Sequence, residues 1–567
     1  MDFRLTIAVL LWVALAGVSL APLLWRSWNR RMGWAAQMAL FIGVLLAAFV
    51  AWRWRSLNYV GEINVDEGTT IAMAMKYLSD PVPWRSVDGV TCGPLSTWVA
   101  LWAPAIGLDL NYLTLRMTAV GLIVVSLVGS AFFLREMVGR RLAFALTLLP
   151  ATLLLTALNF DFVTFAMEHL PIALGVWSVY LLARIRRKTT PLNLFGLGVL
   201  TGAMPFTKLQ AAPSAVFLFG VGVWLVWRAW KGMRQEGTAR IRERGRFRAL
   251  LFLGMGGVVV PASILIPVTV AGVWNEFVYF YLLCGSTYQA NFQKIPILMY
   301  LLRGSAEFGA FFGTAMVGAT VLLAGLFGSG MRGTHGSSEP KEWWVWGAVT
   351  GGYFGVVLYS VLRSGFYFPH YLLLMILPTL LVLAWAVRGH LLMGRVLGGV
   401  SGRLGMVRSV VLGALAIQGW VAFGEYQANP ALLKPWGIEQ NPLFEAIQKL
   451  TSPGDCMAIW GWNNKLHVRT GIRPATRFVG LTYVIDPAPQ YNFHRKVFLE
   501  DLKASKAKLF IDAVDEFRWP SWPAGAAARH TMMPELAAYI RDNYQLAGEL
   551  QTAPNRLPVQ VYVRKSP

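Results

Sequence analysis

The chain has 567 residues, of which 56% are hydrophobic and only 14% are charged. Because soluble domains usually carry about 25% charged residues, this composition excludes an ordinary soluble protein. The net charge of +22 raises the question of a nucleic-acid partner, but aromatic residues are not interleaved with the arginine clusters in the manner of a nucleic-acid-binding surface. We therefore expect a protein embedded in the lipid bilayer, with basic loops between its spans and no nucleic acid among its partners.

Long apolar runs alternate with short arginine-rich breaks along most of the chain. In a bilayer such runs satisfy their backbone hydrogen bonds only as helices, and about twenty residues make one crossing. The pattern predicts a polytopic α-helical membrane protein with about 12 transmembrane helices. They are expected near 5–25, 33–52, 117–134, 142–158, 168–184, 192–207, 211–228, 249–272, 306–328, 343–362, 369–388 and 407–423.

The basic loops all fall on one side of the membrane under this assignment. They lie near 26–31, 135–141, 184–188 and 228–248, and the positive-inside rule makes that side cytoplasmic. The apolar run at 5–25 is long for a signal peptide and lacks a clean cleavage site, so we expect a retained helix. Both termini are then outside.

Three outer segments are too long to be simple connectors: 53–116, 274–305 and the tail, 424–567. Long ordered loops usually carry function, so we expect the active site on this face. Amphipathic patterns at 67–78 and 94–106 predict two helices that lie along the membrane surface.

The tail is expected to form a separate periplasmic α/β domain, with 1–423 as the transmembrane domain. Its hydrophobicity falls and charges of both signs appear. Alternating helix and strand patterns indicate a small α/β domain packed on the outer face. Helices are predicted at 442–450, 494–504 and 534–543, and strands at 456–460, 508–514 and 558–563.

Two other patterns carry little functional weight. Cys92, Cys284 and Cys456 all map to the outer side, where one disulfide between Cys92 and Cys284 is conceivable and unpaired thiols are the simpler interpretation. Their spacing offers no zinc site. The pattern GxGxxG at 328–333 follows a membrane helix, and the dinucleotide fingerprint requires a strand there, so we discard it.

Adjacent carboxylates, Asp66 and Glu67, stand at the start of the helix predicted at 67–78. In a purely structural interpretation, Asp66 caps the helix and Glu67 favours its positive end. In the functional interpretation, a carboxylate base is held at the membrane surface. The sequence leaves both open.

Further acidic residues, Asp161 and Glu168, lie in the outer turn after the fourth predicted span. A carboxylate at the entrance of a span is costly unless it is solvated or partnered. Glu168 is therefore either a surface residue among the headgroups or part of a site. Arg116 enters the third span from the same side.

Cationic and aromatic residues follow on the outer side. Lys208 lies at the outer end of the sixth span, where its ammonium either extends to the headgroups or holds a phosphate. Arg363, His370 and Tyr371 lie in the outer turn between the tenth and eleventh spans. The structural interpretation of that turn is an interfacial aromatic belt with an arginine anchor.

These residues belong to short motifs that occur in the order Val65-Asp66-Glu67-Gly68, Gly93-Pro94-Leu95, Leu115-Arg116, Leu134-Arg135-Glu136-Met137-Val138-Gly139, Glu168-His169-Leu170-Pro171, Phe206-Thr207-Lys208, Pro369-His370-Tyr371, Trp460-Gly461-Trp462 and Arg473-Pro474-Ala475-Thr476-Arg477-Phe478. In this order they resemble the GT-C superfamily of membrane glycosyltransferases, in particular the bacterial branch related to protein O-mannosyltransferases and aminoarabinose transferases. The resemblance covers about 33–480. The chain departs from the family in having a whole span before the one that leads into the Asp66 loop.

The resemblance implies transfer of a sugar from a polyprenyl-phosphate-linked donor to an envelope glycan, glycolipid or protein acceptor, without a cofactor. The reaction is expected at the periplasmic face of a bacterial inner membrane. Asp66 is the expected general base, because the acceptor hydroxyl loses a proton as the glycosidic bond forms. Glu67 and Glu168 are expected to orient hydroxyl groups.

The leaving lipid phosphate gains negative charge, which cationic side chains can stabilise. The residues expected to bind substrate are Lys208, Arg363, His370, Arg303, Tyr371, Asp161 and Arg116. Asp66 with Glu168 could hold a hard cation, but cationic side chains can replace it, so no tightly bound metal is expected.

The main alternative is a transporter or flippase of lipid-linked sugars, which would also have many spans and intramembrane charge. Such proteins usually contain internal repeats and a site near the membrane midplane. The sequence has no evident repeat, and its candidate residues gather on one face. A non-catalytic scaffold that uses the tail is a third possibility.

Overall fold

A computed structural model describes residues 3–89, 92–232, 239–284, 296–328, 339–363, 365, 367–396, 400–428, 441–517 and 519–566. The chain forms two compact units. The first comprises Met1–Leu57, Ala119–Ser263 and Phe292–Pro435, and the second comprises Asn58–Thr118, Ile264–Asn291 and Trp436–Pro567. Most of the discarded GxGxxG pattern, 329–333, falls outside the described residues.

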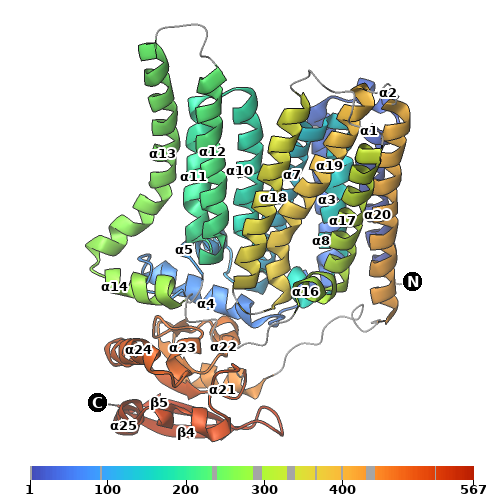
Figure 1. Ribbon diagram of the computed structural model, residues 1–567. Coiled ribbons are helices and arrows are strands. Elements are labelled where there is room, and N and C mark those ends of the chain that lie inside the picture. Colours follow the sequence, from blue (N-terminus) through green and yellow to red (C-terminus); the bar gives the residue numbers. More distant parts are fainter. Residues whose placement is uncertain are drawn as a thin grey trace. The chain divides into compact units, whose positions relative to one another are not determined.

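Helices make up the described part of the first unit, and the long ones run side by side (Figure 1). In chain order, with α3, α7 and α13 extending into the second unit, they are α1 (Phe3–Leu24), α2 (Arg26–Arg31), α3 (Trp34–Asn58), α7 (Tyr112–Val138), α8 (Arg140–Thr156), α9 (Phe160–Val163), α10 (His169–Arg187), α11 (Pro191–Ala203), η2 (Met204–Phe206), η3 (Leu209–Ala211), α12 (Ala212–Gly232), α13 (Ala239–Val270), α16 (Ile297–Arg303), α17 (Ala306–Gly328), α18 (Glu339–Arg363), η6 (Pro369–Met375), α19 (Ile376–Val396) and α20 (Val400–Ala428).

Within the described residues, nine helices are long and apolar enough to cross a membrane. Each coincides with a predicted span. The helices α8, α10 and α11 coincide with the other predicted spans, but they are shorter or end in several arginines. The prediction of a polytopic helical membrane protein is confirmed, and the number of about 12 spans stays a prediction.

Glycines allow α11 and α13 to approach each other closely. A Cβ at Gly198 of α11 would lie 2.2 Å from the carbonyl oxygen of Leu253, and one at Gly202 would lie 2.5 Å from that of Gly257. No side chain fits at these distances. Small residues of this kind let membrane helices pack backbone against backbone.

A tryptophan pair joins α18 to α19. The rings of Trp343 and Trp385 stack with centroids 4.7 Å apart, and each indole N–H donates to the other residue's carbonyl oxygen at 3.0 Å. Gly347 and Gly389 leave room for the rings, because a Cβ at either position would lie 2.5 Å from the indole opposite. Both indole donors are thereby satisfied in an apolar setting.

Short helices open the second unit: α4 (Val65–Ser79), α5 (Pro94–Trp98), η1 (Val99–Leu101) and α6 (Trp102–Ala105). The helix predicted at 67–78 is confirmed. The one predicted at 94–106 is divided into three short pieces, since Pro104 lacks the backbone N–H that would continue a regular helix. Farther along, α14 (Trp274–Glu276) leads into a π-helical turn, η4 (Phe277–Leu283).

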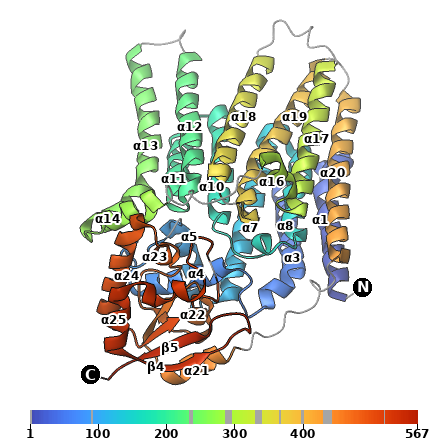
Figure 2. The ribbon, with the colours of Figure 1, turned by 60° about the horizontal axis from the view of Figure 1, so that its bottom comes forward.

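The tail contains an α/β fold, as predicted (Figures 1 and 2). Strands β2, β1, β3, β5 and β4 form one sheet in that order; β1 pairs in parallel with β2 and β3, and β5 pairs antiparallel with β3 and β4. The short edge strand β2 and the exposed β4 were not predicted. The elements are α21 (Pro442–Leu450), β1 (Cys456–Trp460), α22 (Lys465–Thr470), β2 (Arg473–Pro474), α23 (Thr482–Ile485), η8 (Pro489–Tyr491), α24 (Asn492–Ser505), β3 (Leu509–Asp512), η9 (Gly525–Ala528), η10 (His530–Met532), α25 (Pro534–Asn543), β4 (Tyr544–Leu550) and β5 (Val559–Arg564).

The core of the tail lies between the sheet and two of its helices. Leu443 and Ile447 of α21 and Leu466 of α22 are fully buried against side chains such as Met457 of β1 and Ile511 of β3. The spacing of the α21 residues places one apolar stripe toward the strands. This packing fixes the turn that follows β1.

Candidate active site

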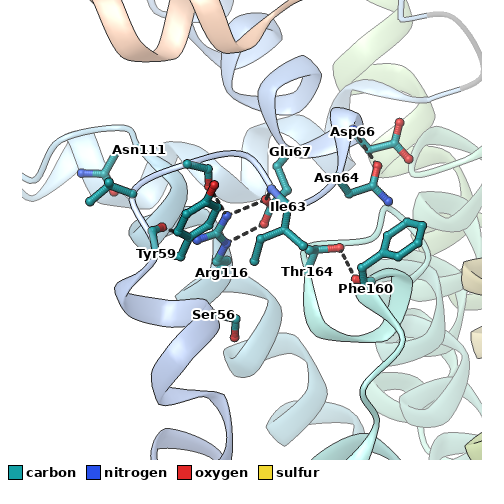
Figure 3. Close-up of polar contacts among 12 residues, drawn as sticks. Ser56, Tyr59, Ile63, Asn64, Asp66, Glu67, Asn111, Arg116, Phe160 and Thr164 are labelled. Carbon is teal, nitrogen blue, oxygen red and sulfur yellow. Dashed lines mark hydrogen bonds and ion pairs between the residues drawn. The ribbon is translucent and has the colours of Figure 1, made fainter. Parts of the chain in front are cut away.

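The first turn of α4 holds Asp66 and Glu67. Asn64 is the N-cap: its side-chain oxygen accepts from the Asp66 amide at 3.0 Å, and its carbonyl oxygen accepts from the Glu67 amide at 2.9 Å. The interpretation in which Asp66 caps this helix is therefore wrong, because Asn64 occupies that position. Asp66 is partly buried, and its carboxylate is directed away from the Glu67 side chain (Figure 3).

Glu67 forms a two-pronged ion pair with Arg116 (Figure 3). The guanidinium Nε donates to Oε1 and Nη2 donates to Oε2, both at 2.7 Å. Arg116 also donates to the carbonyl oxygens of Tyr59 and Gly61, at 2.5 and 2.7 Å, and Glu67 Oε2 accepts from the Ile63 amide at 3.0 Å. Both side chains are fully buried. The pair thus ties the loop before α4 to the start of α7.

Gly68 lies where the turn after β1 packs on α4. A Cβ at this position would lie 3.2 Å from the Lys465 amide nitrogen and 2.1 Å from Glu62 Oε1. At the next residue, the Thr69 hydroxyl accepts hydrogen bonds from Trp462 Nε1 at 2.8 Å and from the Asn464 side-chain nitrogen Nδ2 at 2.9 Å. The motifs around Asp66 and Trp462 are therefore parts of one packed surface within the second unit.

In the first unit, Glu168 pairs with Lys208. The Lys208 ammonium donates to Glu168 Oε1, and both side chains are buried. Lys208 has an extended backbone between η2 and η3, so it interrupts the helical path from α11 to α12. Its ammonium also lies 4.6 Å from the centre of the Tyr371 ring, a favourable cation–π arrangement.

A second acid–base pair, Asp161 with His370, belongs to the same unit. His370 Nδ1 lies 3.3 Å from Asp161 Oδ2, and the His370 amide donates to that oxygen at 3.4 Å. Asn159 caps the short helix α9 by accepting from the Asp161 amide at 3.0 Å. Because His370 is next to Tyr371, the two pairs meet, and we call Asp161, Glu168, Lys208, His370 and Tyr371 the polar cluster.

Two residues that the sequence interpretation missed hold the loop that carries Asp161. Arg53 is buried and donates to the carbonyl oxygens of Leu154 and Phe162. Glu307 accepts from the amides of Leu158 and Asn159, at 2.7 and 3.3 Å. A charged residue beside an apolar run is costly unless it has such a partner, and this was the signal available in the sequence.

The remaining predicted cations are exposed. Arg363, at the end of α18, donates to the Tyr359 hydroxyl at 3.0 Å, and Arg303 ends α16. The described residues contain no group of three or more His, Cys, Asp or Glu side chains suited to a metal ion, and the absence of a tightly bound metal stays a prediction.

Burial shifts the pKa of several groups in the second unit. It lowers the pKa of His467 and of His494 to about 4. It raises the pKa of Asp88 to about 7, a shift that the backbone hydrogen bond from Gly89 and the charge of Arg477 partly oppose. In each case burial favours the uncharged form.

Comparison with known proteins identifies the fold. No protein-family model matches the chain, and no curated protein matches its sequence. ArnT from Cupriavidus metallidurans bound to undecaprenyl phosphate is 15% identical with a TM-score of 0.50, over 93% of this chain and 98% of that one. The same protein in the apo state is 14% identical with a TM-score of 0.48, over 92% and 97%.

AglB, an oligosaccharyltransferase from Archaeoglobus fulgidus in complex with an inhibitory peptide and a dolichol-phosphate, is 12% identical with a TM-score of 0.41, over 90% of this chain and 70% of that one. The likeness to the undecaprenyl-phosphate complex of ArnT, an aminoarabinose transferase, extends over nearly the whole of both chains. The resemblance inferred from the sequence motifs is thereby confirmed for the fold. The chain has the fold of the GT-C membrane glycosyltransferases.

Proposed function

We propose that this chain is a membrane glycosyltransferase that moves a sugar from a polyprenyl-phosphate donor to an envelope glycan, glycolipid or protein. The buried Glu168–Lys208 pair carries this proposal. This chain shares the fold of ArnT, and the crystal structure of ArnT contains undecaprenyl phosphate. A lysine ammonium is a compact, mobile positive charge that suits a phosphate. Glu168 orients the ammonium, and Tyr371 supports it from the ring side.

In the donor half of the reaction, Lys208 and His370 act on the phosphate of the leaving group. The bond between the sugar C1 and the phosphate oxygen breaks, and its electron pair stays on the phosphate. Lys208 and His370 stabilise the charge that develops there. Asp161 holds His370 in place, and the exposed Arg303 and Arg363 suit the headgroup region.

The acceptor half of the reaction requires a base. A hydroxyl oxygen of the acceptor bonds to C1 while its proton passes to Asp66. Glu67 is less suited to this task, because both of its oxygens already accept charge-assisted hydrogen bonds from Arg116. We therefore assign Glu67 and Arg116 to positioning the turn that carries Asp66.

A transfer assay in detergent tests the proposal. Purified protein is mixed with a polyprenyl-phosphate sugar and envelope acceptors, and Asp66→Asn is expected to lower the rate by about 10²- to 10⁴-fold. Asp80→Asn is the matched control, since Asp80 ends the same helix in an exposed ion pair with Arg85. Equal activity of both variants would remove Asp66 from the mechanism.

The same preparation addresses the alternative function. Translocation of the lipid-linked sugar across vesicles, without product from any acceptor, would favour a flippase. We also propose that the arginine-rich helix ends face the cytoplasm and that the tail is periplasmic, as the positive-inside rule requires. A fused reporter enzyme that is active only in the periplasm tests this orientation: activity supports it when the reporter follows the tail, and contradicts it when the reporter is inserted after α10.

A further inference from the structure

A cavity lies within the first unit among α7, α10, α12, α18 and α19. Most of its lining is apolar, with Val179 of α10, Phe217 of α12 and Tyr353 of α18 among the residues that form the walls. The cavity is partly open to the outside, so a ligand can enter it from the surface of the helix bundle.

Two arginines line the cavity near one end of these helices. Arg186 is in the last turn of α10, where it pairs with Glu342 at 3.0 Å and lies 5.4 Å over the Trp346 ring. Arg388 of α19 donates to the carbonyl oxygen of Met137 at 2.9 Å. These contacts hold both guanidiniums at the cavity, and a guanidinium has five N–H groups with which to bind more than one acceptor.

The cavity therefore combines an apolar wall with a cationic end. From Arg186 back to Val179, and from Arg388 back to Leu381, each helix extends about 10 Å along the lining. The apolar lining suits methylene groups of an acyl chain, and the guanidiniums suit a phosphate. We propose that this cavity binds one anionic phospholipid, with a chain between α10, α12 and α18 and its phosphate at Arg186 and Arg388.

The proposed lipid is distinct from the polyprenyl donor. Glu168 immediately precedes α10, whereas Arg186 is near its end, so about 27 Å of helix separates the polar cluster from the cationic end of the cavity. On the proposed orientation this end faces the cytoplasmic leaflet, where anionic lipids attract basic residues. The lipid would contact α10, α18 and α19 together. Glu168 directly precedes α10, and His370 lies in η6, which leads into α19.

Native mass spectrometry of the full chain in mild detergent tests the proposal. Phosphatidylglycerol is expected to bind with one-to-one stoichiometry and more tightly than phosphatidylcholine with the same chains. Arg186→Met and Arg388→Met are each expected to weaken binding about fivefold. Val179→Phe, which fills the cavity and keeps both arginines, is expected to abolish binding. Arg184→Met is the matched control, because Arg184 is an exposed residue on the same helix that does not line the cavity.

Several outcomes would overturn the proposal. Equal binding of the two phospholipids would do so, as would an equal loss of phosphatidylglycerol binding in Arg184→Met and Arg186→Met. Full binding by a folded Val179→Phe variant would place the lipid elsewhere. Displacement of phosphatidylglycerol by undecaprenyl phosphate or by inorganic phosphate alone would also contradict the proposal. Thermal unfolding of each variant in detergent establishes that it is folded. Because no sugar transfer is measured, the result is independent of the proposed enzymatic activity.

Discussion

Two buried acid–base pairs in this chain differ in how fully their hydrogen-bonding groups are used. In the second unit, Arg116 divides its donors between both oxygens of Glu67 and two backbone carbonyl oxygens. In the first unit, Lys208 meets Glu168 through one point charge and faces an aromatic ring. The first pair resembles a structural clamp, and the second retains capacity for a ligand.

The difference lies in the chemistry of the two cations. A guanidinium is a planar fork that locks a carboxylate and nearby carbonyl oxygens in one geometry, whereas an ammonium is a compact charge on a flexible stem. A buried pair is therefore weak evidence of a functional site by itself. What separates the two pairs is whether the cation can still serve a phosphate.

The largest expected effect is on the clamp. Arg116→Met leaves the buried Glu67 charge without its partner, so we expect it to lower the free energy of unfolding by about 3–5 kcal/mol. Chemical unfolding in detergent measures this loss, and transfer activity should fall by more than the folded fraction does, because the turn that carries Asp66 also loses its position. Arg85→Met, which removes an exposed ion pair with Asp80, should cost less than about 1 kcal/mol. Equal losses would contradict the assignment of a clamp.

Next in size is the effect at Lys208. Lys208→Met should lower kcat by about 10²- to 10³-fold, as the loss of one donor to a developing charge does in other enzymes. The substitution also leaves Glu168 buried without its partner, so stability should fall as well. The double variant Glu168→Gln, Lys208→Met should recover stability but not activity. A double variant that regains activity would make this pair a clamp like the first.

A smaller effect is expected at Gly68. Gly68→Ala forces Glu62 to move and presses on the backbone at Lys465, which should cost about 1–3 kcal/mol. It should also lower transfer activity, because the turn carrying Asp66 shifts. Gly121→Ala is the control, since a Cβ at Gly121 meets nothing within 4 Å. Indistinguishable unfolding curves for the two variants would show that the contact at Gly68 is unimportant.

The smallest expected effect is a pH dependence of the second unit. The pKa of His467 and of His494 is about 4 in the fold and about 6.5 when unfolded. Their stabilising contribution is therefore complete above pH 6.5 and is lost as the pH falls toward 4. Asp88, whose pKa is raised to about 7, acts in the opposite sense, because its contribution is lost as the pH rises to 7.

With two histidines opposing one carboxyl group, we expect a net loss of about 1–2 kcal/mol between pH 7 and pH 5. Hydrogen exchange of tail peptides in the full chain measures it. His467→Gln should flatten the dependence, and Asp88→Asn should steepen it. Exchange protection that rises as the pH falls would contradict these assignments.

Much of the fold could be predicted because its signals are local. Apolar runs located the spans, and strand and helix patterns located β1, α21 and α25 with their bounds. The edge strand β2 has two residues and β4 is largely exposed, so neither has a burial pattern that a sequence displays. The break in the helix predicted at 94–106 was visible in Pro104 but was not interpreted.

The sequence alone determined that this protein spans a membrane, which residues are charged at span ends, and that their order resembles the GT-C family. Only the tertiary structure decided the partners: Glu67 with Arg116, Glu168 with Lys208, and Asp161 with His370, at separations of 49, 40 and 209 residues. A charge in an apolar setting must find a counter-charge or polar groups, but which one it finds depends on helix packing. That packing made Glu67 part of a clamp and directed Asp66, its neighbour, away from it.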